Sequence, residues 1–135
     1  MIEVGWDNTE KNIIIWTFSA PWTWDEFYDI QSKQHSMIDE VTGIVDSIFI
    51  TSTEQNIPFS AFTHLREIMA KSHDRDGIFV VVGARPFLAT LLNIVAQMLP
   101  NFTSRIILVG DKAEAYRLIA KVRESRQPVA RTLVS

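Results

Sequence analysis

Two residues, Ser60 and Arg85, each lie at the start of a different predicted helix, where their side chains could take part in chemistry. Ser60 follows Ile57-Pro58-Phe59 and precedes apolar residues at helical spacing, so its hydroxyl can accept a hydrogen bond from an unpaired backbone N–H. A phosphate on the same hydroxyl would be stabilised by the positive end of the helix dipole. Arg85 follows the apolar strand 78–82, at the kind of strand-to-helix turn where α/β proteins bind anions. Ser60 is therefore either a helix cap or a phosphorylation site, and Arg85 either a solvated turn residue or an anion ligand.

The other reactive residue types form no recognisable motif. The chain has no cysteine, which excludes disulfides, thiolate metal sites and cysteine nucleophiles. Of the three histidines, His35 is remote in sequence, and His64 and His73 are nine positions apart on one predicted helix, too far to bind one metal ion. Nucleotide-binding glycine loops and the Gly-x-Ser-x-Gly motif do not occur in the sequence. We predict no metal, no cofactor and no enzymatic activity.

Composition indicates one soluble globular domain. The 135 residues are 47% apolar and 21% charged, and the net charge of −3 comes from 13 basic and 16 acidic residues mixed along the chain. Nucleic-acid binding requires a clustered basic surface, so DNA and RNA are not expected partners. The longest apolar stretch, residues 87–99, is interrupted by polar residues and is too short to span a bilayer. We expect a cytoplasmic protein without a membrane span.

Strands and helices alternate along the chain after an opening hairpin. The expected strands are residues 2–6, 13–18, 44–50, 78–82 and 105–109. The expected helices begin near Thr23, Ser60, Pro86 and Asp111. This order predicts an α/β fold, with a mostly parallel sheet of four to five strands that is opened by an antiparallel hairpin and flanked by about four helices.

The limits of the helices and of the domain follow from capping and composition. Capping boxes over residues 23–26 and 111–114 predict the starts of the first and last helices. Gln34 interrupts the otherwise apolar inner side of the first helix. We expect a single domain over residues 1–123 and a loose C-terminal tail over residues 124–135, where the apolar pattern ends.

The third predicted helix has more apolar surface than a single core-facing stripe requires. Its apolar residues cover most of the circumference, whereas a surface helix needs an arc of roughly 100°. A second copy of the chain is one candidate to cover the excess, because two-fold dimers are the commonest assemblies. Burial of the helix within its own domain is the other. The homodimer interface would consist of Phe87, Leu88, Leu91, Leu92 and Val95.

Aromatic residues are concentrated early in the chain, around the start of the first helix. Trp22, Trp24 and Phe27 would line a pocket for an apolar ligand if they surround a cavity. Aromatic residues at strand and helix spacing equally suit a packed core. A pocket would make the protein a carrier of an apolar ligand. A packed core would instead indicate a module that acts through protein contact.

The order of elements and several short segments resemble the STAS domain, the fold of the anti-sigma-factor antagonists. That fold is related to the lipid-binding CRAL-TRIO-type proteins, and the chain is also similar to small bacterial STAS-like proteins of unknown function. The likeness covers about residues 2–122. It is carried by the segments 22–27, 62–65, 80–84 and 111–119.

The resemblance implies a role for Ser60. In antagonists of this family, a partner kinase phosphorylates a serine at the start of the second helix, and this releases a regulated partner. Ser60 occupies that place, although Ile57-Pro58-Phe59-Ser60 stands where the family has an Asp-Ser-Ser-Gly signature. The function that the resemblance implies is a non-enzymatic regulatory or protein-binding module with a phospho-switch. The lipid-binding relatives imply the alternative, a small apolar-ligand or lipid carrier.

Overall fold

The computed structural model describes residues 1–7, 9–51, 61–83, 97 and 105–134 of the chain. The strands in this part are β1 (Ile2–Trp6), β2 (Ile13–Phe18), β3 (Val45–Ile50), β4 (Asp76–Val82) and β5 (Ile106–Val109). The helices in this part are α1 (Trp24–Asp39), α2 (Ala61–Ala70) and α5 (Lys112–Val134). The helix predicted to begin near Pro86 falls almost wholly outside the described residues.

The strands form one five-stranded sheet in which each strand pairs with the next strand along the chain, in the order β1-β2-β3-β4-β5. β1 and β2 are antiparallel, and the other three pairs are parallel. A two-stranded antiparallel pair needs only a short turn, whereas parallel neighbours need crossover connections. The predicted α/β fold with a hairpin-opened, mostly parallel sheet is thus confirmed.

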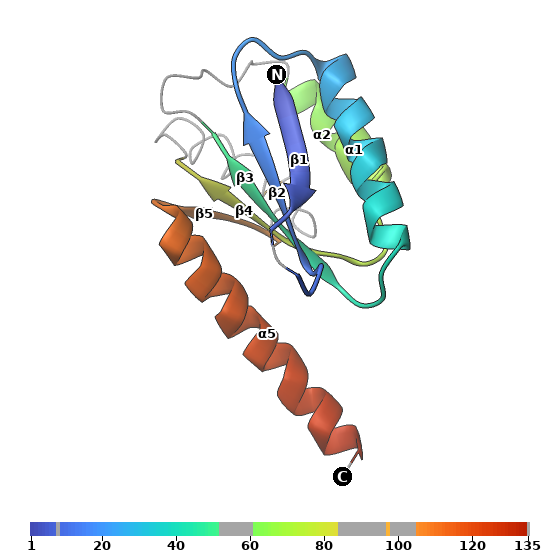
Figure 1. Ribbon diagram of the computed structural model, residues 1–135, viewed down its shortest axis with the longest axis vertical. Coiled ribbons are helices and arrows are strands. Elements are labelled where there is room, and N and C mark those ends of the chain that lie inside the picture. The colour runs from blue at the N-terminus through green and yellow to red at the C-terminus, as the bar shows by residue number, and fades with distance from the viewer. Residues whose placement is uncertain (8, 52–60, 84–96, 98–104, 135) are drawn as a thin grey trace.

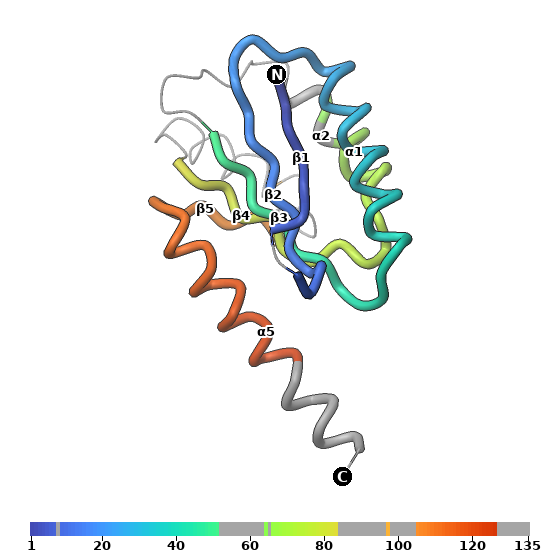
Figure 2. The backbone as a smooth tube through the Cα atoms, viewed as in Figure 1, coloured from blue at the N-terminus to red at the C-terminus, as the bar shows by residue number. Residues whose placement is uncertain are grey.

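Helices cover the two faces of the sheet unequally. α1 and α2 lie together on one face, and α5 lies on the other face, where it packs against β3, β4 and β5 (Figure 1). The backbone trace shows the same arrangement, with β1 at the edge of the sheet beside α1 (Figure 2). The sheet therefore has two cores, one under α1 and α2 and one under α5.

Alternation along β2 explains how one strand contributes to both cores. Ile14, Trp16 and Phe18 pack in the core beneath α1. Ile13 and Ile15 belong to the core beneath α5, because successive side chains of a strand point to opposite faces. Trp16 is only 2% exposed, so the largest side chain of the strand is fully enclosed.

Both predicted capping residues cap their helices, but each glutamate binds a different backbone N–H from the one expected. The hydroxyl of Thr23 accepts a hydrogen bond from Glu26 N at 3.1 Å, and Asp111 accepts one from Glu114 N at 2.8 Å. The Glu114 carboxylate accepts from Gly110 N at 3.0 Å. The Glu26 carboxylate accepts from Ile2 N at 2.9 Å and so joins α1 to β1.

A buried carboxylate fastens α5 to the sheet. Asp46 in β3 is fully buried, and Arg126 donates to both of its oxygens at 3.1 and 3.0 Å. Arg123 donates to Asp46 Oδ2 at 3.2 Å, and the backbone N–H of Ile78 donates to Oδ1 at 2.9 Å. A Cβ on Gly77 would lie 2.0 Å from Asp46 Oδ1. Only glycine therefore fits beside the carboxylate.

The first residues of the expected C-terminal tail lie within α5, and one of them belongs to the ion cluster. We expect residues 124–135 to be loose, but α5 continues from Lys112 to Val134. Arg126, which lies within the expected tail, is one of the two guanidinium groups that bind Asp46. The partner of Arg126 is 80 positions away along the chain, so no local pattern marks residue 126 as part of the fold.

Replacing Asp46 with asparagine should lower the free energy of unfolding by about 3 kcal/mol, because two guanidinium groups would lose their buried counterion. The measurement is urea unfolding followed by tryptophan fluorescence. Glu124→Gln, at an exposed position of α5, is the matched control and should change stability by less than about 0.5 kcal/mol. Equal stability of Asp46→Asn and the control would show that the ion cluster does not hold α5.

Candidate functional site

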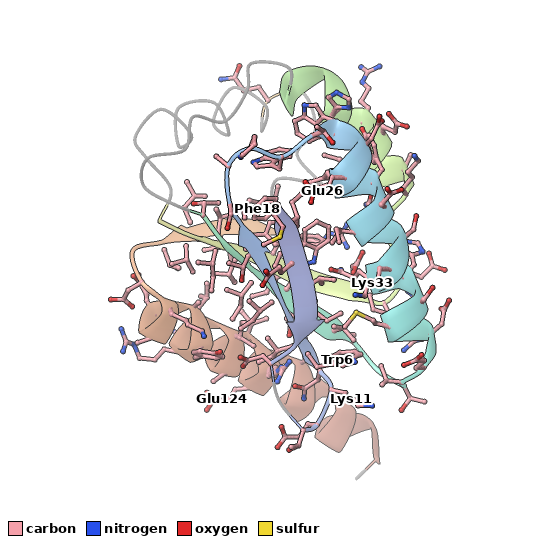
Figure 3. All side chains as sticks on the ribbon, turned by 45° about the horizontal axis from the view of Figure 1, so that its top comes forward. Trp6, Lys11, Phe18, Glu26, Lys33 and Glu124 are labelled. Atoms are coloured by element: carbon pink, nitrogen blue, oxygen red, sulfur yellow. The ribbon has the colours of Figure 1, made fainter. Side chains whose placement is uncertain are left out.

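An aromatic cluster lies at the carboxyl edge of the parallel strands, where ligands of α/β proteins commonly bind. β2 ends at Phe18, and α1 begins at Trp24. α2 begins at Ala61, after β3 has ended at Ile50. Phe18 and Glu26 mark this end of the sheet in Figure 3, close to the start of α2. The first turns of α1 and α2 are therefore neighbours at this edge.

His64 joins these two first turns. Its ring stacks on the Trp24 indole, with centroids 4.3 Å apart and planes inclined by 17°. Its Nδ1 lies 2.6 Å from the Tyr28 hydroxyl. One imidazole from α2 thus contacts two side chains on consecutive turns of α1.

The polar contacts of Tyr28 continue to the surface. Burial, followed by a hydrogen bond to Glu67 and the charge of that carboxylate, raises the pKa of Tyr28 to about 12. Glu67 in turn pairs with Lys71 at 3.0 Å, and the hydrogen bond from Lys71 is the main cause of a lowered Glu67 pKa. In the 2.6 Å contact between the Tyr28 oxygen and His64 Nδ1, the phenol is the donor when Nδ1 carries no proton, and the imidazole is the donor in the Nδ1–H tautomer.

The three aromatic residues expected to line an apolar pocket contact one another. The ring centroids of Trp22 and Trp24 are 4.9 Å apart, and those of Trp24 and Phe27 are 5.4 Å apart. Phe27 is 7% exposed, whereas Trp22 and Trp24 are half-buried. These contacts are those of an aromatic layer whose outer members reach the surface. The pocket itself stays a prediction.

Several predicted site residues lie outside the described part of the chain. They are Ser60, Arg85, Phe87, Leu88, Leu91, Leu92 and Val95. α2 spans Ala61–Ala70 in the described part of the chain, and the predicted capping position Ser60 itself lies outside the described residues. His64 follows Ser60 by four positions.

A second polar cluster, which sequence reasoning misses, is buried between α1 and the sheet. Gln34 is 3% exposed, and its Nε2 donates to Asp76 Oδ1 at 3.1 Å and to Ser47 Oγ at 3.3 Å. Its Oε1 accepts from the indole N–H of Trp16. The interruption of the apolar stripe at position 34 was the one available signal, because a buried amide needs polar partners.

The cluster reaches the surface through His73. The His73 backbone N–H donates to Asp76 Oδ2 at 2.8 Å. The ring accepts from Arg75 N at Nδ1, at 3.0 Å, and its Nε2 lies 2.7 Å from Asp39 Oδ1. His73 therefore carries its proton on Nε2 and donates it to Asp39. The fold also brings His35 to 5.1 Å from His73 between ring centroids, although the two are remote in sequence.

The described residues provide no metal-binding group and no membrane-spanning helix. Among them, no three histidine or acidic side chains are arranged to hold a metal ion. None of the helices in the described ranges is both long and apolar enough to cross a bilayer. Comparisons of the chain with protein-family models, characterised proteins and solved structures find no match. The class that the structure defines is an α/β domain with a five-stranded mixed sheet.

Asp76 should make stability depend on pH in a direction opposite to that of most carboxylates. Burial raises the pKa of Asp76 above its ordinary value of 3.8, so the folded state binds its proton more tightly than the unfolded state does. The free energy of unfolding should therefore increase as pH falls from the raised pKa towards 3.8. The measurement is urea unfolding of the wild type and of Asp76→Asn at a series of pH values. The free energy of unfolding of the wild type minus that of Asp76→Asn should increase as the pH falls through this window. A difference that stays constant or decreases would contradict this expectation.

Both tyrosines should ionise late in the native protein. The chain has two tyrosines, and the pKa values of Tyr28 and Tyr116 are both raised to about 12, mainly by burial. An ultraviolet titration of the native protein should therefore show tyrosinate forming near pH 12 instead of 10. Tyr28→Phe should remove about half of the amplitude without moving the rest. A native titration that coincides with that of the urea-unfolded chain would contradict the assignment.

Proposed function

We propose that this chain is a non-enzymatic STAS-like regulatory module that acts through protein contact, with Ser60 as its phosphorylation switch. The observation that carries the proposal is the contact of His64 with both Trp24 and Tyr28. It couples the start of α2 to the start of α1. The order of strands and helices, and the start of α2 directly after Ser60, support the STAS-like assignment.

Phosphorylation at position 60 would act on this coupling by electrostatics. A phosphate at a helix start gains from the helix dipole and from the free backbone N–H groups there. His64 is four residues further on, the spacing at which side chains of one helix are neighbours. A phosphate would therefore attract the imidazole and compete with its contacts to Trp24 and Tyr28. The surface formed by the first turns of α1 and α2 would change, and a partner that binds there would be released.

The proposal includes a cytoplasmic location and a homodimer. The dimer contact predicted from the sequence uses Phe87, Leu88, Leu91, Leu92 and Val95 of the third helix. No catalytic role is assigned to any residue. Arg85 remains a candidate anion ligand at the same carboxyl edge.

The second candidate function is a carrier of an apolar ligand or lipid. The half-buried Trp22 and Trp24 at the carboxyl edge favour it, because aromatic side chains in that place commonly line binding sites. A small molecule that co-purifies with the native protein, seen by native mass spectrometry and lost on denaturation, would support the carrier over the regulatory module.

Ser60→Asp should abolish binding of a partner that the wild type and Ser60→Ala retain. The three proteins are immobilised in parallel, and bound proteins from an extract are compared by quantitative mass spectrometry. We expect at least one partner to be depleted about tenfold or more with Ser60→Asp, which corresponds to about 1.4 kcal/mol. The matched control is Ser125→Asp, at an exposed serine of α5, which should retain the partner. Identical partner sets for all four proteins would refute the switch.

A further inference from the structure

Along β1, the backbone N–H and C=O groups of successive residues point alternately towards β2 and towards the outer edge of the sheet. Met1 and Ser19 exchange hydrogen bonds in both directions, and Asp7 N donates to Ile13 O at 2.9 Å. Antiparallel pairs alternate between bonded and non-bonded residues. With the observed register, Glu3 and Gly5 therefore bond to β2, and the N–H and C=O groups of the intervening residues point outward.

The outward N–H of Ile2 has a partner, and this supports the assignment. It donates to the Glu26 carboxylate of α1. The next outward groups are those of Val4 and Trp6, and β1 is the end of the sheet among the described strands. These two residues offer backbone donors and acceptors in the spacing that another antiparallel strand requires.

β1 has only some of the features by which proteins prevent pairing at an edge strand. Glu3 is charged, and the Glu26 carboxylate of α1 occupies the outward N–H of Ile2. The sequence Ile-Glu-Val-Gly-Trp contains no proline or lysine, and the strand pairs with β2 without a bulge. A Cβ placed on Gly5 would meet nothing within 4 Å, and it would point to the face of the sheet opposite to Val4 and Trp6, which pack beneath α1. The outward backbone groups of Val4 and Trp6 are the part of the edge at which a strand could be added.

The neighbouring side of α1 continues this surface. Glu26 and Lys33 lie on the side of α1 nearest β1, and Trp6 lies at the far end of the strand (Figure 3). Ile30 and Met37 follow Glu26 at helical spacing and pack partly on the core beneath α1. The edge therefore combines a strand with a helix side on which Ile30 lies between Glu26 and Lys33, and Met37 follows Lys33.

We propose that the homodimer forms at this edge and not through residues 87–95, with the β1 strands of the two copies antiparallel and a two-fold axis at Val4. Ile2 of one copy then lies opposite Trp6 of the other, and Glu3 lies opposite Gly5, so the two Glu3 side chains are diagonal neighbours and not directly opposite each other. Such a contact would join the two sheets into one continuous sheet across the dimer.

The positions of Glu26 and Lys33 on α1 are compatible with a two-fold axis at Val4. β1 and α1 run side by side in the same direction (Figure 1). From Ile2, two residues along the strand cover about 6.6 Å. From Glu26, whose carboxylate binds Ile2 N, about four residues along the helix cover a similar distance. Ile30 therefore lies beside Val4, near the axis. Glu26 precedes Ile30 by four positions and Lys33 follows it by three, so the Glu26 of each copy comes opposite the Lys33 of the other.

Two variants test this contact by sedimentation velocity over a wide concentration series. Val4→Pro removes an outward N–H without breaking the ladder to β2, because the Val4 N–H does not point towards β2. Lys33→Glu, at an exposed position, places like charges across the axis. Each should raise the dimer dissociation constant about tenfold or more. Circular dichroism and thermal unfolding check that the monomers stay folded, and Lys121→Glu on α5, also exposed, should leave the dimer unchanged.

The contact is also measurable by distance. The chain has no cysteine, so Glu3→Cys can carry a single spin label. The two labelled positions are diagonal neighbours across the axis, with about 7–8 Å between their Cα atoms, and strong dipolar broadening is expected in the dimer. A wild type that stays monomeric at the highest concentration would overturn the proposal. So would a dimer that shows no broadening, or one that Leu91→Glu dissociates while Val4→Pro and Lys33→Glu leave it intact.

Discussion

A carboxylate with no exposure to water must find positive charge and hydrogen-bond donors inside the protein, and Asp46 imposes this requirement on the middle of the sheet. Arg123 and Arg126 meet it from α5, and the backbone of Ile78 meets it from β4. Gly77 must be glycine because the carboxylate occupies the space of a side chain. The position of α5 and the local sequence of β4 both follow from one buried charge.

On the face of the sheet beneath α1, the neutral amide of Gln34 joins the helix to the strands, as Asp46 does on the face beneath α5. Gln34 takes a place in α1 where an apolar residue would complete the stripe, and it links β2, β3 and β4 through Trp16, Ser47 and Asp76. An amide can donate and accept at once. It can therefore bind an indole N–H and a carboxylate in the same cluster. On each face of the described sheet, a buried polar group thus joins the strands to the helix above them.

The sequence predicts the elements well and their polar partners poorly, for a physical reason. Periodicity and capping depend on residues a few positions apart, so the strands, the starts of α1, α2 and α5, and the hairpin are all predictable. The partners of Asp46 are 77 and 80 positions away, and no local pattern connects them. The same holds for His64, whose contacts to Trp24 and Tyr28 exist only because the two helices start at the same edge. Gln34 gave a visible signal, whereas Gly77 had the composition of a turn and lies in a strand.

The strictly sequential strand order has a consequence for how the chain is made. Each strand pairs with the one synthesised just before or after it, so the sheet can grow by one strand at a time as the chain leaves the ribosome. Asp46 is among the early residues, whereas both of its guanidinium partners come after the last strand. Until α5 emerges, the nascent sheet contains a carboxylate without a counterion. Docking of α5 is therefore the step that completes the native state, and a ribosome that stalls before residue 123 would hold an unfinished domain.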